Sequence, residues 1–215
     1  SKIDELVKKG QPFAKKIHGI DPDIILQGAI FEVVTKDINN VVIPEPVFEE
    51  FGVPKETRNF SYKAMLYPFG HRHNHWSKDS SVPDMSRLET RMWFFYVAKR
   101  WIDMGIEAIH FGQVEIMDDW DRSHRHWRDI MKRIRDYAKK NARRHIVLTD
   151  AHVPSGGIVH DGNLMFDLHS FPSRPKSVKG KPYKAILEKG FSDSIYGRSK
   201  GGVTPSGWKC DALPY

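Results

Sequence analysis

The stretch "RRHIVLTDAHVPSGGIVHDGNLMFDLHSFPSRP", residues 143–175, decides the fold, because it contains two apolar runs that end in the same polar pattern. The first run ends in Asp150 and His152, and the second ends in Asp167 and His169. Side chains two residues apart on a strand point to the same face of a sheet. Each run is therefore predicted to be a buried strand that presents an acid and an imidazole at its exit.

Apolar runs and helical segments alternate along the rest of the chain. Residues 23–34 and 106–117 are apolar runs of the kind found in strands that are covered on both faces. Residues 86–104 and 123–143 carry apolar side chains at helical spacing. This alternation is typical of parallel strands joined by helical crossovers. We predict that both helices pack outside one sheet, whose parallel strands are 24–34, 106–117, 145–152 and 164–169.

Shorter patterns add details to this outline. Ser86 and Glu89 form a capping-box pattern at the start of the first long helix, and Gly105 is predicted to end it. A short helix is predicted over residues 181–190, with Gly190 as its terminator. The segments "SYKAMLYPF" and "ALPY" are weaker candidates for additional strands.

A chain of 215 residues with 40% hydrophobic and 12% aromatic content can bury a sizeable core as one domain. The order of strands and helices predicts an α/β fold of the eight-stranded TIM-barrel type. A complete barrel needs about 250 residues, so residues 1–215 are predicted to form a single barrel domain or part of one. Residues 39–81, rich in Pro, Gly, His and Asn, are predicted to be a long loop insertion at the rim of the active site.

Composition narrows the set of partners. The formal net charge is +7, but the Lys and Arg residues are dispersed, so we expect no nucleic-acid partner. No apolar stretch reaches the roughly 18–20 residues of a membrane span, and the chain is predicted to be soluble. The single cysteine, Cys210, excludes an internal disulfide and a multi-cysteine zinc site. The first residue is Ser, so secretion or a periplasmic location after removal of a leader stays open, and the oligomeric state is undetermined.

A third polar pair, Gln113 and Glu115, lies at the exit of the preceding predicted strand. Three consecutive strands would then deliver polar side chains to the carboxyl edge of one sheet, where α/β enzymes place their reaction centres. His110 faces the opposite side in an unbroken strand, and only a bulge at Gly112 would bring it to the same face. The alternative is that the Asp residues cap turns and the His residues bind backbone carbonyls.

The segments "AIHFGQVEIM", "HIVLTDAH" and "LMFDLHSFPSRP" resemble the middle strands of TIM-barrel glycoside hydrolases, and the likeness extends over residues 22–175. The resemblance implies hydrolysis of a poly- or oligosaccharide by carboxylate general acid/base catalysis, without a metal or other cofactor. Glu115 is the expected acid/base, and Asp150 or Asp167 its catalytic partner. Glu32 is a weaker candidate that is expected to pair with a base. The predicted substrate-binding residues are Gln113, His152, His169, His71, His73 and Trp76, with further aromatic faces from Trp120 and Trp208.

Two other functions stay open as alternatives. Asp and His at strand exits are also ligands for zinc, manganese or iron, and "HRHNH" at 71–75 could add more. These residues would make the protein a metal-dependent hydrolase. A non-catalytic barrel that only binds carbohydrate is the third function, because a fold alone does not establish an activity.

Overall fold

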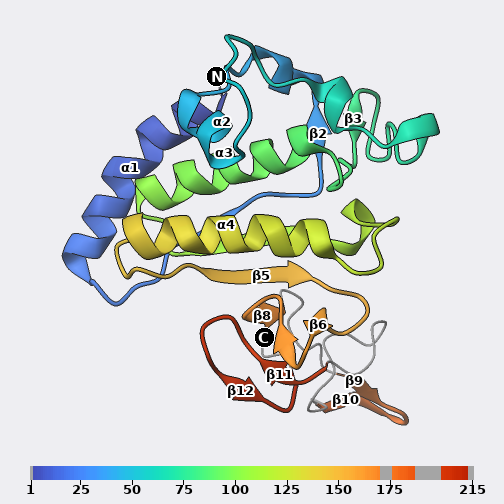
Figure 1. Ribbon diagram of the computed structural model, residues 1–215. Helices are drawn as coiled ribbons and strands as arrows, with labels where there is room; N and C mark the ends of the chain where they lie inside the picture. The colour runs from blue at the N-terminus through green and yellow to red at the C-terminus, as the bar shows by residue number, and fades with distance from the viewer. Residues whose placement is uncertain (1, 170–175, 187–199, 213–215) are drawn as a thin grey trace.

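A four-stranded parallel sheet forms the centre of the fold (Figure 1). The computed structural model describes residues 2–169, 176–186 and 200–212. The sheet has the order β1-β4-β5-β8, and each strand is parallel to its neighbours. Its strands are Gln27–Ala29 (β1), Ala108–Gln113 (β4), Leu148–His152 (β5) and Leu168–His169 (β8). The predicted parallel sheet is therefore confirmed, although each strand is shorter than the apolar run that predicted it.

The predicted eight-stranded barrel is wrong, because the other described strands form small separate sheets. After β5 the chain reverses through Asp161 and Gly162, whose φ angles are 49° and 77°, as in a two-residue hairpin turn. This antiparallel hairpin, in place of a crossover helix, connects β5 to β8, and no described strand after β8 joins the parallel sheet. The separate sheets are β12-β11-β7-β6, β2-β3 and β10-β9, with bounds Val34–Thr35 (β2), Ser80–Ser81 (β3), Val159–His160 (β6), Asn163–Leu164 (β7), Lys176–Val178 (β9), Lys181–Ile186 (β10), Gly202–Val203 (β11) and Lys209–Cys210 (β12).

Two local predictions are also corrected. Residues 181–186, expected to be helical, form β10 and pair with β9 across a turn in which Gly180 has φ 75°, a conformation that suits glycine. Residues 187–190 lie outside the described residues, as does most of "ALPY". The segment "SYKAMLYPF" contains two 3-10 helices, η2 (Tyr62–Met65) and η3 (Pro68–Gly70), in place of a strand.

The two long helices are confirmed as α3 (Leu88–Met104) and α4 (Arg125–Asn141), which lie side by side with α4 next to β5 (Figure 1). Trp127 of α4 is fully buried, with its ring 5.7 Å from Phe94 of α3 and 5.8 Å from Phe111 of β4. Its indole N–H donates to the Val114 carbonyl at 3.0 Å. This one side chain therefore packs both helices against the sheet without leaving its polar atom unpaired.

The start of α3 differs from the predicted capping box. The helix begins at Leu88 and has no side-chain cap, whereas Gly105 ends it in the left-handed conformation, as expected. The buried carboxylate of Glu89 accepts hydrogen bonds from the Arg58 guanidinium and the Ser61 backbone N–H, both at 2.8 Å. A buried carboxylate without hydrogen-bond partners costs more free energy than an uncapped helix end. Glu89 therefore binds Arg58 and Ser61 in place of forming a capping box.

The remaining helical elements precede the sheet or interrupt its connections. They are α1 (Lys2–Ile20), η1 (Lys36–Asn40), α2 (Glu45–Glu50) and η4 (Glu115–Met117). The predicted loop insertion over 39–81 thus contains α2, η2, η3 and β3. Within the described ranges, no helix combines the length and the apolar character that crossing a bilayer requires.

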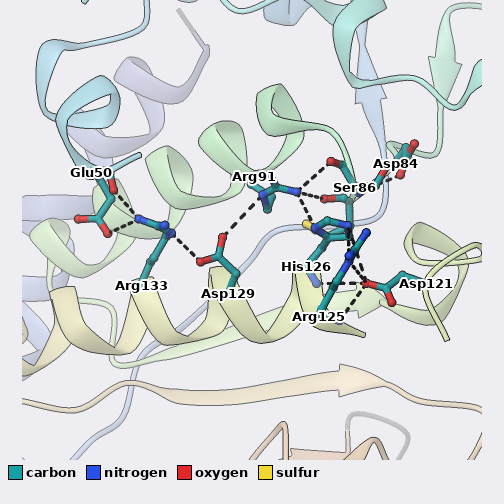
Figure 2. A network of polar contacts seen from close by, with 10 residues as sticks. Glu50, Asp84, Ser86, Arg91, Asp121, Arg125, His126, Asp129 and Arg133 are labelled. Carbon is teal, nitrogen blue, oxygen red and sulfur yellow. Dashed lines mark hydrogen bonds and ion pairs between the residues drawn. The ribbon is translucent and has the colours of Figure 1, made fainter. Parts of the chain in front are cut away.

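A chain of charged side chains holds α2, α3 and α4 together (Figure 2). Arg133 of α4 donates to Glu50 of α2 at 3.1 Å and to Asp129 at 3.0 Å. Arg91 of α3 lies 3.7 Å from Asp129 and donates to the Ser86 carbonyl and to His126 Nδ1. Burial lowers the pKa of the Arg91 guanidinium. The helices that cover the sheet are therefore joined by polar contacts as well as by the core.

A bulge in β4 changes which side chains share a face. His110 pairs with Asp150 and Gln113 pairs with His152, so Phe111 and Gly112 lie opposite the single residue Ala151. Gly112 has φ +62°, in the left-handed region that favours glycine. Asp150 and His152 face the same side of β5, so the bulge places His110 and Gln113 together on that side. The sequence placed His110 in the predicted site only if the strand bulged at Gly112, and the structure contains this bulge.

Replacing Gly112 with Ala should both destabilise the protein and displace Glu32. A Cβ atom at position 112 would stand 1.9 Å from Glu32 Oε2 and 3.2 Å from the Glu32 backbone nitrogen. Gly52 is a matched control, because its φ is +61° but nothing lies within 4 Å of its added Cβ. We expect Gly52→Ala to lower the free energy of unfolding by about 1–2 kcal/mol, and Gly112→Ala by about 1–3 kcal/mol more because of overpacking. Urea unfolding measures both, and equal losses would contradict the close approach of Glu32.

Candidate functional site

Asp150 and His110 form a hydrogen-bonded pair between the adjacent strands β5 and β4. Asp150 is buried, and its Oδ2 atom lies 3.1 Å from His110 Nδ1. Its Oδ1 atom accepts a hydrogen bond of 2.7 Å from Gln27 Nε2 of β1, which lies on the other side of β4. A carboxylate only accepts hydrogen bonds, so the proton of a neutral His110 belongs on Nδ1 and the lone pair on Nε2. Three strands thus hold an imidazole in the orientation of a general base.

Two further rings surround His110. The His152 ring centroid lies 4.9 Å away, and the Phe31 ring lies 5.4 Å away in an edge-on arrangement. Burial, and then the nearby His110 charge, lower the pKa of His152, while Glu32 and Asp150 act against this shift. His152 is therefore neutral at pH 7. Phe31 is about half exposed, so it gives this part of the site an apolar face open to solvent.

Glu32 is a second carboxylate beside these imidazoles. It follows β1, is buried, and accepts hydrogen bonds from the Gln113 backbone N–H at 3.0 Å and the Gln113 side-chain amide at 2.9 Å. Its expected partner was a base, and the structure shows a neutral amide in that place. The indole N–H of Trp76 donates to the Glu32 backbone carbonyl at 3.2 Å. The loop residue Trp76, partly exposed, therefore contacts the backbone of Glu32, and its role in binding a substrate at the rim stays a prediction.

Glu115 and His169 occupy the next position along the sheet edge. The predicted strand 106–117 ends at Gln113, so Glu115 lies in η4 and is not a same-face strand neighbour of Gln113. Its Oε2 atom accepts a single long hydrogen bond, 3.3 Å, from the Ser155 backbone N–H. His169 is buried, and its Nε2 atom lies 3.0 Å from the Val153 carbonyl. Burial lowers the pKa of His169, and the charges of Glu115 and Asp150 act against this.

These side chains are called the edge cluster below. It comprises the predicted residues Gln113, Glu115, Asp150, His152 and His169, together with Glu32 and His110. Gln27 and Phe31 support it and were not predicted. The sequence signal for His110 was Gly112, and no local pattern marked Gln27 or Phe31.

Asp167 does not belong to the edge cluster. Its Oδ2 atom accepts hydrogen bonds of 2.9 Å from the Thr149 backbone N–H and hydroxyl, and its Oδ1 atom accepts one of 2.9 Å from the Ser206 N–H. The side chain is buried and joins β5 to the segment between β11 and β12. This position matches the capping interpretation and leaves Asp167 without a catalytic geometry.

The predicted rim histidines are held by residues other than the edge cluster. His71 Nε2 lies 2.8 Å from Asp119 Oδ2, and the His71 ring stacks on Trp120 at 5.2 Å. His73 Nε2 lies 2.8 Å from the Tyr67 carbonyl. Trp208 is largely exposed and lies near β12. Of the predicted rim residues, Trp76 is the one with a hydrogen bond to a member of the edge cluster.

The alternative of a metal site has no ligand set in the part of the chain that the structure describes. Among residues 2–169, 176–186 and 200–212, no three His, Cys, Asp or Glu side chains gather as metal ligands do. The HRHNH segment of the loop is bound instead through Asp119 and the Tyr67 carbonyl. The edge cluster therefore presents hydrogen-bonded acids and imidazoles.

The lowered pKa of His169 predicts a loss of stability in acid. Below its ordinary pKa of about 6.5, the unfolded chain binds a proton that the folded chain excludes from the buried imidazole. The free energy of unfolding therefore falls as the pH decreases through 6.5 toward the lowered pKa. Replacing His169 with Gln should make this fall shallower by up to about 1.4 kcal/mol per pH unit. Urea unfolding between pH 7.5 and 5.5 measures the slope.

His124 provides a control of the opposite sign. Its hydrogen bond to Asp118 Oδ2, 2.8 Å long, raises its pKa. The protonated imidazole therefore adds stability that is present below pH 6.5 and is lost as the pH rises through the raised pKa. His124→Gln should make the fall toward acid steeper. An unchanged slope in His169→Gln would contradict a neutral buried His169.

Comparison with known proteins does not assign the chain to a family. No protein-family model matches it, and no curated protein is significantly similar to it. A function for the edge cluster has to be argued from its chemistry.

Proposed function

We propose that the edge cluster is the active site of a glycoside hydrolase that acts on a poly- or oligosaccharide. The observation that carries this proposal is the meeting of Glu32 and Asp150 with the imidazoles of His110 and His152, together with the charge of Glu115 that acts on the nearby His169. Hydrolysis of a glycosidic bond needs one group that protonates the leaving oxygen and a second group that attacks carbon or activates water. The cluster offers candidates for both roles.

Glu115 is the proposed general acid. It is partly exposed and accepts one long hydrogen bond, so its carboxyl group is the least constrained of the three acids. A group that gives up and regains a proton in each turnover needs such access. Glu32 and Asp150 each accept two shorter hydrogen bonds, which hold their carboxyl groups in fixed positions.

The Asp150–His110 pair is the proposed base. Asp150 holds the Nδ1 proton of His110, so the Nε2 lone pair accepts a proton from water and the carboxylate stabilises the resulting imidazolium. In the reaction, the water oxygen attacks the anomeric carbon and the glycosidic C–O bond breaks. Glu115 gives its proton to the leaving oxygen, and His110 takes the proton of the water. Proton exchange with solvent then restores both groups.

Two exposed aromatic rings support a saccharide as the substrate. Phe31 packs against His110, and Trp76 is hydrogen-bonded to the backbone of Glu32. Both rings are exposed beside polar groups, and apolar faces combined with a few placed hydrogen-bonding groups are typical of small-ligand sites. Gln113 and His152 are the proposed partners of the sugar hydroxyls.

Replacing Glu115 with Gln should lower kcat by about 10²–10⁴-fold, because the amide has the shape of the carboxyl group but cannot donate the catalytic proton. Release of reducing ends from a broad panel of oligosaccharides measures the rate. The control is Glu45→Gln, which removes a surface carboxylate paired with Lys55 and should leave kcat unchanged. Circular dichroism checks that both variants are folded.

Other outcomes would overturn this proposal. Full activity in Glu115→Gln would exclude Glu115 as the acid. Activity that is lost on chelation, together with near-stoichiometric transition metal in the wild-type protein, would favour the metal-dependent hydrolase. Saturable sugar binding without cleavage of any member of the panel would favour a carbohydrate-binding protein.

A further inference from the structure

A second polar pocket lies between α4 and the β6–β7 hairpin, and it is separate from the edge cluster. Its volume is about 250 Å³. Met131, Leu164 and neighbouring apolar side chains form its walls, and its polar lining includes Arg128, Arg135, His160 and Asn163. None of these four polar residues has a role in the hydrolysis proposed above.

Both arginines that line this pocket have an unused donor. The Nε atoms of Arg128 and Arg135 are buried and have no hydrogen-bond partner. Among the described residues, none accepts a hydrogen bond or forms an ion pair with the Arg128 guanidinium. Arg135 is partly engaged, since its Nη2 atom donates to the Thr149 hydroxyl at 3.1 Å and to the Met165 carbonyl. A buried donor without an acceptor costs about 1–3 kcal/mol, and more when it is charged.

Arg128 and Arg135 line the pocket from the same face of α4. They are seven residues apart, two turns of the helix, and Met131 lies between them on that face. Burial lowers the pKa of Arg135 to about 10, and the charge of Asp167 acts against this shift. Even so, the Arg135 guanidinium group remains charged at neutral pH.

Among the described residues, no carboxylate inside the pocket balances this charge. Asp161 is the acidic residue of the lining, but its side chain is largely exposed and pairs with His160 at 2.9 Å. Arginine binds carboxylate, sulfate and phosphate groups well because its N–H donors match two oxygen atoms of one group. Two such donors in a concave, partly apolar pocket are therefore suited to a small anionic ligand.

We propose that Arg128 and Arg135 bind an oxyanion, a carboxylate, sulfate or phosphate group of a small ligand, in the pocket between α4 and the β6–β7 hairpin. Each guanidinium group donates to an oxygen atom of this group, and Asn163 and His160 contact the remainder of the ligand. The apolar side chains of Met131 and Leu164 exclude water from the ion pair and so strengthen it. This site does not depend on the glycosidase activity proposed for the edge cluster.

Titration calorimetry of the full chain tests the site with sodium sulfate, sodium phosphate and sodium glucuronate, with NaCl added to hold the ionic strength constant. At least one of these probes should bind saturably with one site per chain. Arg128→Gln should weaken that binding at least about tenfold, since it removes one charge-assisted hydrogen bond of about 1.5–3 kcal/mol. Arg122→Gln, which removes an exposed arginine just before α4, should leave the affinity unchanged. Binding of sulfate and phosphate alone identifies a tetrahedral group, and binding of glucuronate alone identifies a carboxylate.

A second measurement guards against loss of folding. Arg128 makes no hydrogen bond to the described chain, so Arg128→Gln is expected to fold, whereas Arg135→Gln also removes the contacts to Thr149 and Met165. In the wild-type protein, the NMR signals of the two buried Nε–H groups should shift on addition of the bound anion. No saturable binding of any probe, or equal affinity in wild type and Arg128→Gln, would overturn the site. Either result can occur whether or not Glu115 proves to be catalytic.

Discussion

The carboxylate of Glu32 occupies the space in which a side chain at position 112 would stand. This approach is allowed because residue 112 is glycine and because β4 bulges there against β5. The bulge has two consequences for the sheet edge. It brings the Gln113 side chain to the face that His110 and Asp150 already share, and it places the Gln113 backbone and side-chain amides against Glu32. Without it, Gln113 would face the opposite side of the sheet from His110 and Asp150.

Periodicity predicted the elements that pack against the core. The four apolar runs became the parallel sheet, and the two amphipathic segments became α3 and α4, because burial of one face requires that spacing. The barrel prediction failed because the described strands outside this sheet pair among themselves in small sheets. The connection from β5 to β8 contains the β6–β7 hairpin, which turns at the left-handed residues Asp161 and Gly162, in place of a helix. The α1 helix was not predicted, because one of its 19 residues is buried and its pattern carries little core signal.

The candidate site was predictable in part. Asp150 and His152 share a face of β5, as the two-residue period of a strand requires. Asp167 shows the same Asp-x-His spacing but binds Thr149 and Ser206, and the sequence holds no sign of these tertiary partners. The prediction that His110 shares a face with Gln113 depended on a bulge at Gly112, and a glycine permits a bulge without requiring one. Gln27 and Phe31 reach the site through the pairing of β1 with β4, which only the fold specifies.

Many arginines of this basic chain make structural contacts within the protein. Arg91 and Arg133 connect helices and loops through carboxylates and backbone carbonyls (Figure 2). Arg58 does the same through Glu89. Arg143 and Arg144 both donate to the buried Glu107. Arg128 differs from these, because its guanidinium faces a pocket and has no acceptor among the described residues. Some of the arginines behind the net charge of +7 therefore join elements of the fold, and others belong to the proposed anion site.

The protonation state of the His110 ring tests most directly whether Asp150 makes His110 a catalytic base. Long-range proton–nitrogen NMR correlation distinguishes the two neutral forms of an imidazole. We expect the proton on Nδ1 and a bare Nε2 in the wild-type protein, because Nδ1 lies 3.1 Å from the Asp150 carboxylate. In Asp150→Asn this preference should weaken or reverse. A wild-type His110 with its proton on Nε2, or a spectrum unchanged by Asp150→Asn, would contradict the assembly of the edge cluster.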